Sequence, residues 1–267
     1  MEFLTDTAGT PQFAHILLLF SAALMAGAMN SVAGGGSFFS FPALLFVGLD
    51  AKIANATNTV ALWPGSMAGV GAYRVELRAQ RETARLLSGV SLGGGLIGAL
   101  LLLITPSDIF RRLLPYLMLG ATLLFALSPR LNQFMRRAER HRTAHAHAAH
   151  NRRRSVLLQG IISIYGGFFG GGIGILMLAT LSLMGLEDIH EMNALKTWLA
   201  TLINGIAVVT FMLARAVAWP EVLLMATGAI LGGYGGGALA RRLRPQLVRH
   251  FVVTVGFVLS GYLFLRA

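Results

Sequence analysis

Long apolar stretches separated by short polar turns run through the chain, and they predict ten helical segments. Several stretches hold about 20 apolar residues, the length that crosses ~30 Å of hydrocarbon at a rise of ~1.5 Å per residue. The predicted segments are residues 13–33, 38–47, 53–73, 86–105, 109–127, 156–169, 175–185, 192–214, 218–240 and 247–265. This pattern predicts an all-α polytopic membrane protein.

The apolar pattern occurs twice, on either side of a polar stretch at 128–155. In each half a glycine run follows the first segment, and a short segment follows the run. A shift of 137 residues places Gly35 on Gly172, and a shift of 138 places Asn55 on Asn193. The predicted organisation is a first transmembrane repeat at 1–127, a basic His- and Arg-rich cytoplasmic linker at 128–155 and a second transmembrane repeat at 156–267.

Arginine is concentrated in three regions, 74–85, 130–154 and 241–249. The positive-inside rule places all three in the cytoplasm. Two full spans and one glycine-broken pair separate the second region from the third, so the broken pair must make an even number of crossings. Each half is then one glycine-broken re-entrant helix pair plus three transmembrane helices. An odd number of crossings inverts the second repeat relative to the first and places both termini outside the cytoplasm. The segment 13–33 is also long enough to cross alone, which would place the N-terminus inside.

Composition narrows the class of protein further. The chain is 55% hydrophobic and 12% charged, whereas soluble domains carry about 25% charged residues. The formal charge of +11 lies in short loops between apolar segments, so orientation in the lipid bilayer explains it and no nucleic-acid partner is expected. Because the chain has no cysteine, disulfides and thiolate chemistry are excluded. No cofactor is expected.

Four histidines, His141, His145, His147 and His150, lie in the predicted linker. His141 and His145 have the i,i+4 spacing of a metal-binding pair on a helix. Nothing around them indicates an enclosed site, so the favoured interpretation is a solvated linker or an arm attracted to anionic lipid. No metal site is expected.

The glycine breaks are the predicted functional centre. Backbone that leaves the helix inside a bilayer must be buried in protein or line a wet cavity, and the helix start after each break presents N–H groups that favour an anion. The candidate substrate-binding residues are Gly34, Gly35, Gly36, Ser37, Asn55, Thr57, Asn58, Gly170, Gly171, Gly172, Asn193, Lys196 and Thr197. The competing interpretations are helix packing for the glycines, helix capping for the asparagines and interfacial snorkelling for Lys196.

Two segments of the first half, residues 33–45 (AGGGSFFSFPALL) and 55–58 (NATN), resemble the sulfite exporter TauE/SafE family. The second half is similar through residues 170–174 (GGGIG) and 193–197 (NALKT). It departs from the first half by having Ile173 and Gly174 where the first half has the hydroxyl of Ser37, and by having Ala179 where the first half has Pro42.

The resemblance implies a secondary transporter of the inner membrane that moves small sulfur-containing anions, sulfite or organosulfonates, and is coupled to an ion gradient, often of protons. Its expected partners are a small anionic solute and the lipid bilayer. The oligomeric state is left undecided, with a homodimer as one alternative. An anion channel of the same fold and a carrier for a different small organic anion are the alternatives. Because no intramembrane cluster of His, Asp and Glu occurs, no enzyme is expected.

Overall fold

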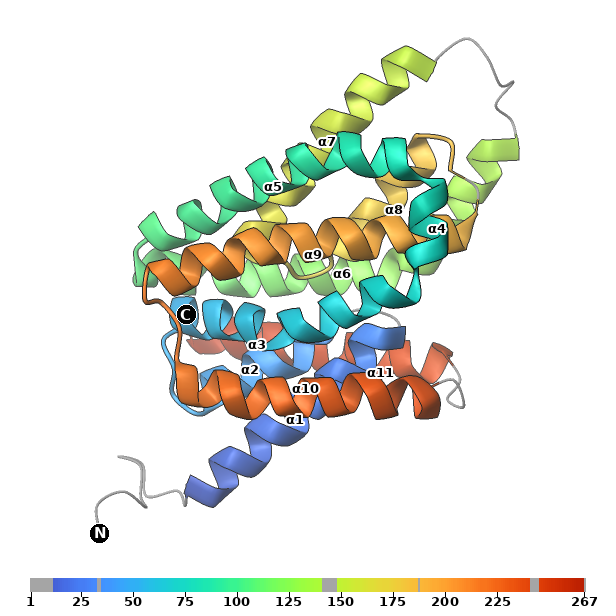
Figure 1. Ribbon diagram of the computed structural model, residues 1–267. Helices are drawn as coiled ribbons and strands as arrows, with labels where there is room; N and C mark the ends of the chain where they lie inside the picture. Colours follow the sequence, from blue (N-terminus) through green and yellow to red (C-terminus); the bar gives the residue numbers. More distant parts are fainter. Residues whose placement is uncertain (1–11, 33–34, 141–147, 187, 241–244, 267) are drawn as a thin grey trace.

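The computed structural model describes residues 12–32, 35–140, 148–186, 188–240 and 245–266, and helices fill almost all of them (Figure 1). The helices are α1 (Gln12–Val32), α2 (Ser37–Phe46), α3 (Ala51–Ala72), α4 (Arg74–Ala79), α5 (Arg81–Ile104), α6 (Ser107–Arg140), α7 (Ala148–Phe168), α8 (Ile173–Leu183), α9 (Ile189–Leu213), α10 (Trp219–Ala240) and α11 (Pro245–Arg266). No strand occurs in these described ranges. The predicted all-α fold is confirmed.

The ten predicted segments correspond to ten of these helices, and the polar regions differ from the prediction. The short helix α4 forms within the first basic region, where a loop was expected. Helix α6 continues to Arg140, and α7 begins at Ala148, so most of the expected linker is helical. This stretch is rich in Arg and Ala, which are good helix formers. His141, His145 and His147 lie outside the described residues.

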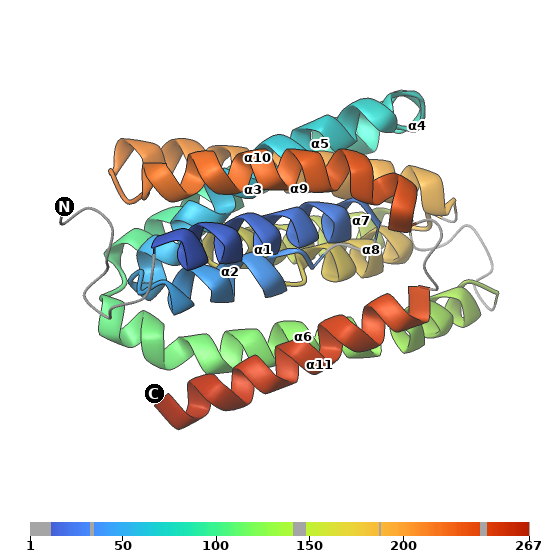
Figure 2. The same ribbon diagram turned by 90° about the horizontal axis from the view of Figure 1, so that it is seen from below.

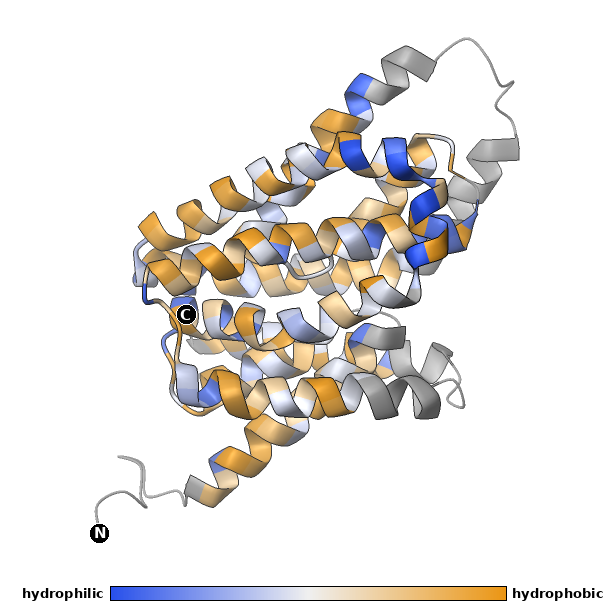
Figure 3. Cartoon of the chain, viewed as in Figure 1, coloured by the Kyte–Doolittle hydropathy of each residue, from blue (hydrophilic) through white to orange (hydrophobic). Residues whose placement is uncertain are grey.

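Four of the described helices are long and apolar enough to cross a membrane. Their apolar windows are Phe13–Asn30 in α1, Arg81–Ile104 in α5, Ser107–Ser128 in α6 and Ile189–Leu213 in α9. Hydrophobic residues predominate along these helices (Figure 3), and many large apolar side chains are exposed, among them Ile97 and Leu213 at 49% and 81%. Such surfaces suit lipid rather than water. The chain is therefore a membrane protein.

Each glycine run separates a long helix from a short one that packs back against it. Helix α2 contacts α1, and α8 contacts α7. Figure 2 shows that α1 starts at one end of the molecule and α3 starts at the same end, after α2 has returned. Helices α7, α8 and α9 follow the same course from the opposite end (Figures 1 and 2). The breaks predicted at both glycine runs are confirmed.

The helices of the two halves contact one another in matching pairs. Helix α1 packs on α10 and α7 packs on α5, while α3 contacts α10 and α9 contacts α5. Helices α3 and α9 cross at the centre, and α6 packs beside α11. The first-half helices correspond in order to helices of the second half: α1 to α7, α2 to α8, α3 to α9, α5 to α10 and α6 to α11. Each contact described above is matched by a contact between the corresponding helices. Corresponding helices run in opposite directions (Figure 1).

Candidate functional site

The second glycine break leaves unpaired backbone donors at the start of α8. Gly170 and Gly172 have φ values of +81° and +76°, a region that side chains other than glycine rarely enter. The Tyr165 hydroxyl donates to the Gly171 carbonyl at 2.7 Å and fixes the turn. Within the described part of the chain, the N–H groups of Gly171, Gly172 and Gly174 have no hydrogen-bond partner. Free N–H groups at a helix start, together with the helix dipole, favour an anion.

Both glycine breaks lie against the middle of α6 and not at its ends. A Cβ atom added to Gly171 would lie 3.1 Å from Ala121 Cβ, and one added to Gly35 would lie 3.1 Å from Phe125 Cε2. Ala121 and Phe125 belong to the apolar window Ser107–Ser128 of α6. The irregular backbone therefore lies at the depth of a membrane-crossing segment, where lipid offers it no hydrogen bonds.

Asn55 and Thr57 connect the first half to backbone of the second half. Asn55 is 3% exposed, and its Nδ2 donates to the Phe168 carbonyl at the end of α7 over 3.0 Å. Thr57 is fully buried, and its hydroxyl accepts from the Ala218 N–H at 3.1 Å, just before α10. Asn55 therefore supports the backbone beside the second break, and Thr57 supports the start of α10.

Asn58 differs from these two neighbours because its amide oxygen has no partner. The residue is 4% exposed, and its Oδ1 accepts no hydrogen bond within the described residues. A buried acceptor left unsatisfied costs about 1–3 kcal/mol. A group that destabilises the folded protein in this way is a candidate for contact with a solute or ordered water.

We expect Asn58→Leu to fold at least as stably as the wild type and to lose transport. The substitution removes an unsatisfied oxygen, so the thermal midpoint in detergent should be unchanged or raised. Thr57→Val is the matched control. It leaves the Ala218 N–H without its acceptor and should lower the stability by about 1–3 kcal/mol. Thermal unfolding and solute uptake of both variants test this; an Asn58→Leu protein with wild-type uptake would remove Asn58 from the site.

Lys196 lies beside the start of α8. A Cβ atom added to Gly174 would lie 3.3 Å from Lys196 Cδ, so the lysine stem packs on the second break. The Lys196 Nζ donates to Asn193 Oδ1 at 2.9 Å, and Asn193 Nδ2 donates to the Ile189 carbonyl at 2.8 Å. Asn193 therefore orients the ammonium group. The structure therefore brings the stem of Lys196, from α9, against the start of α8.

Thr197 lies apart from this cluster, at the crossing of α3 and α9. A Cβ atom added to Gly69 would lie 3.4 Å from the Thr197 methyl group, and the Thr197 carbonyl accepts from the Thr201 hydroxyl at 2.8 Å. The hydrogen bond from Trp63 Nε1 to the Thr201 carbonyl, 3.1 Å long, lies at the same crossing. Thr197 thus contributes to the packing of the two central helices.

The first glycine break satisfies its own backbone more fully. Gly35 has φ +85°, and the Gly36 N–H donates to Asn30 Oδ1 at 2.8 Å. Ser37, the first residue of α2, is half-buried. Gly34 lies outside the described residues. The two breaks are chemically different, and among the candidate residues only Lys196, at the second break, carries a charge.

Tyr165 and Asp50, which caps α3, were not among the residues singled out from the sequence. Asp50 accepts from the Lys52 N–H at the start of α3, and Asp188 accepts from the N–H groups of His190 and Glu191 at the start of α9. The shift of 138 that relates Asn55 to Asn193 also relates these two aspartates. Among the described residues, no group of three or more His, Cys, Asp or Glu side chains is placed to hold a metal.

Comparison with known proteins places the chain in a family. Residues 19–263 match the family model described as sulfite exporter TauE/SafE. The probable membrane transporter protein YfcA of Escherichia coli K12 is 28% identical over 92% of this chain and 88% of its own length. A probable membrane transporter protein, ORF9, of Sinorhizobium sp is 29% identical over 92% and 91%. A probable membrane transporter protein of Haemophilus influenzae is 28% identical over 92% and 93%.

No solved structure matches the chain. The family match covers nearly the whole sequence, including both glycine breaks. The relatives are named as probable membrane transporters, and the similarity extends over almost their full lengths. The chain therefore belongs to the sulfite exporter TauE/SafE family of membrane transporters.

Proposed function

We propose that this protein is a secondary transporter of small sulfur-containing anions, sulfite or organosulfonates, in the inner membrane. The observation that carries the proposal is the second glycine break, where unpaired N–H groups lie beside the Lys196 stem at the depth of a membrane span. Preorganised N–H donors and an ammonium group replace part of the hydration shell that an oxyanion loses in the membrane. Asn58 supplies a further buried polar group on the neighbouring helix.

In this proposal the two halves are inverted repeats that move against one another to alternate access. The matched helix contacts and the opposite directions of equivalent helices support this arrangement (Figures 1 and 2). The positions of the arginines support the orientation. Helix α4 and the starts of α5 and α7, whose sequences contain the arginines of 74–85 and Arg153 and Arg154, lie at the same end of the molecule (Figure 1). By the positive-inside rule this end faces the cytoplasm. Helix α1 starts and α11 ends at the opposite end (Figure 2), so both termini are extracytoplasmic.

Uptake into proteoliposomes tests the proposed function. The purified protein is reconstituted, and uptake of sulfite, sulfate and a short sulfonate is measured with and without a pH gradient. We expect saturable uptake of sulfite or the sulfonate, counterflow against unlabelled solute and a dependence on the pH gradient. Flux that neither saturates nor shows counterflow would instead identify a channel. Liposomes without protein are the control, and no uptake or exchange of any of the three solutes would overturn the anion assignment.

A further inference from the structure

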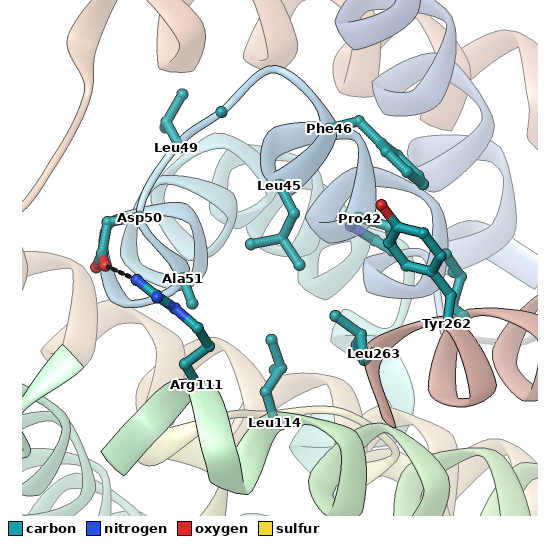
Figure 4. Close-up of a pocket in the computed structure, with 12 residues that line it drawn as sticks. Pro42, Leu45, Phe46, Leu49, Asp50, Ala51, Arg111, Leu114, Tyr262 and Leu263 are labelled. Atoms are coloured by element: carbon teal, nitrogen blue, oxygen red, sulfur yellow. Dashed lines mark ion pairs between the residues drawn. The ribbon is translucent and has the colours of Figure 1, made fainter. Parts of the chain in front are cut away.

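A pocket of about 550 Å³ opens at the end of the molecule opposite α4. It lies between α2, α6, α11 and the first residues of α3. Figure 4 shows Leu45, Leu114 and Leu263 directed into a shared space, with Asp50 and Arg111 on one side. The pocket thus combines three leucines, one from each of three helices, with the ion pair of Asp50 and Arg111.

Arg111 offers the pocket a guanidinium group that is largely free to bind. Its Nη2 lies 3.8 Å from Asp50 Oδ2, and the two side chains are 59% and 32% exposed. Arg111 makes no hydrogen bond within the described part of the chain, although a guanidinium carries five donors in a fork that matches an oxyanion. Exposed ion pairs of this kind contribute ~0–1 kcal/mol. An incoming acid group therefore displaces Asp50 from Arg111 at little cost.

Asp50 keeps its hydrogen bonds when Arg111 turns to another anion. Its Oδ1 accepts from the Lys52 N–H at 3.0 Å and from the Ser107 hydroxyl at 3.2 Å. The N-terminus of α3 also stabilises this carboxylate through the helix dipole. The exchange of counter-ion leaves no charged group without a partner.

Two of the helices that line the pocket, α3 and α6, lead towards the second glycine break. Ala51, which lines the pocket, precedes Asn55 by one turn of α3, or about 6 Å. Leu114 precedes Ala121 by about 10 Å along α6, and Ala121 contacts the break. A solute in this pocket is therefore close to the site at the second break.

We propose that this pocket is an outer binding site for an organic monoanion, whose acid group lies on Arg111 and whose carbon chain packs against Leu45, Leu114 and Leu263. The proposal rests on the proposed transport function and adds to it the kind of solute that the outer end selects. An inorganic anion without a carbon chain would bind Arg111 but make no apolar contact with the leucines. An anionic phospholipid has the same combination of acid group and chain, so the experiment must separate the two sources.

Isothermal titration calorimetry of the full-length protein in a neutral maltoside detergent tests the proposal. The probes are sulfite and alkane-1-sulfonates of one, three and five carbons. We expect the dissociation constant to fall about three- to fourfold for each added methylene, as burial of a CH₂ group predicts. Leu263→Trp takes up part of the apolar space of the pocket and should reduce the gain with chain length.

Arg111→Gln should weaken binding of every sulfonate at least tenfold. Arg112→Gln is the matched control, since Arg112 is exposed but does not line the pocket, and it should bind like the wild type. Binding that is independent of chain length, or equally weakened by both arginine substitutions, would overturn the proposal.

Nanodiscs with and without phosphatidylglycerol separate a soluble anion from a lipid. Equal sulfonate binding in both supports the proposal. Loss of binding with phosphatidylglycerol, together with a tightly bound lipid that Arg111→Gln releases, would overturn it in favour of a lipid site. The binding assay does not depend on transport. Binding that depends on chain length, without any uptake in proteoliposomes, would support the pocket and overturn the proposed transport function. Sulfite uptake without such binding would support the transport function and overturn the pocket.

Discussion

Lys196→Gln is expected to lower the rate of anion uptake into proteoliposomes about 100-fold while the protein still folds. The Lys196 stem packs on Gly174 at the start of α8, next to the unpaired N–H groups of the break. Loss of a charge that pairs with a desolvated anion typically costs about 2–5 kcal/mol, and ~2.7 kcal/mol corresponds to that factor. Asn193 can still accept a hydrogen bond from the glutamine amide, so the local fold should survive.

Lys52→Gln is the control, because these two are the only lysines in the chain. Lys52 Nζ donates to the carbonyls of Leu103 and Thr105, 2.8 and 3.0 Å away, at the end of α5. Its loss should reduce stability modestly and leave the uptake rate within a few-fold of the wild type. Lys196→Arg keeps the charge but not its compact shape, and should retain partial uptake. Wild-type uptake by Lys196→Gln would show that the solute does not use the second break.

Gly98→Val is expected to prevent α5 from packing on α7 and to abolish stable folding. A Cβ atom on Gly98 would collide with the Ile164 carbonyl oxygen and lie 2.7 Å from the Phe168 nitrogen. Both obstacles are backbone of α7, so no side-chain rotation relieves the collision and the helices must separate. Overpacking costs ~1–3 kcal/mol in soluble cores, and more where backbone has to move. Small residues at helix interfaces in membranes allow this close approach.

Gly93→Val provides a control within the same helix. A Cβ atom on Gly93 meets nothing within 4 Å, so this variant carries the same change in helix propensity without the collision. Gel filtration in detergent and the thermal midpoint of both variants give the measurement. We expect monodisperse protein for Gly93→Val and aggregated or absent protein for Gly98→Val; similar thermal midpoints would refute close α5–α7 packing as the cause.

The sequence determined where helices form and where they break. Apolar length placed ten helices within about five residues of the observed bounds, except at the end of α6 and the start of α7. It did so because lipid requires each crossing segment to be long, apolar and hydrogen-bonded within itself. The glycine runs predicted both breaks, since Gly170 and Gly172 adopt backbone angles that other residues avoid. The basic stretch after Leu127 misled the prediction, because a run of good helix formers can be polar and still helical.

Only the tertiary structure decided what each candidate side chain does. Asn55 and Thr57 were predicted as solute ligands, and the structure shows that they also bond backbone groups more than 100 residues away. Such partners cannot be read from local spacing. Lys196 and Asn193 lie three residues apart in sequence, but the position of the Lys196 stem beside Gly174 depends on how α8 folds back. Repetition in a sequence predicts that two halves have a similar backbone arrangement. The chemistry of each half depends on which atoms are left without partners, and that is settled only when the helices pack together.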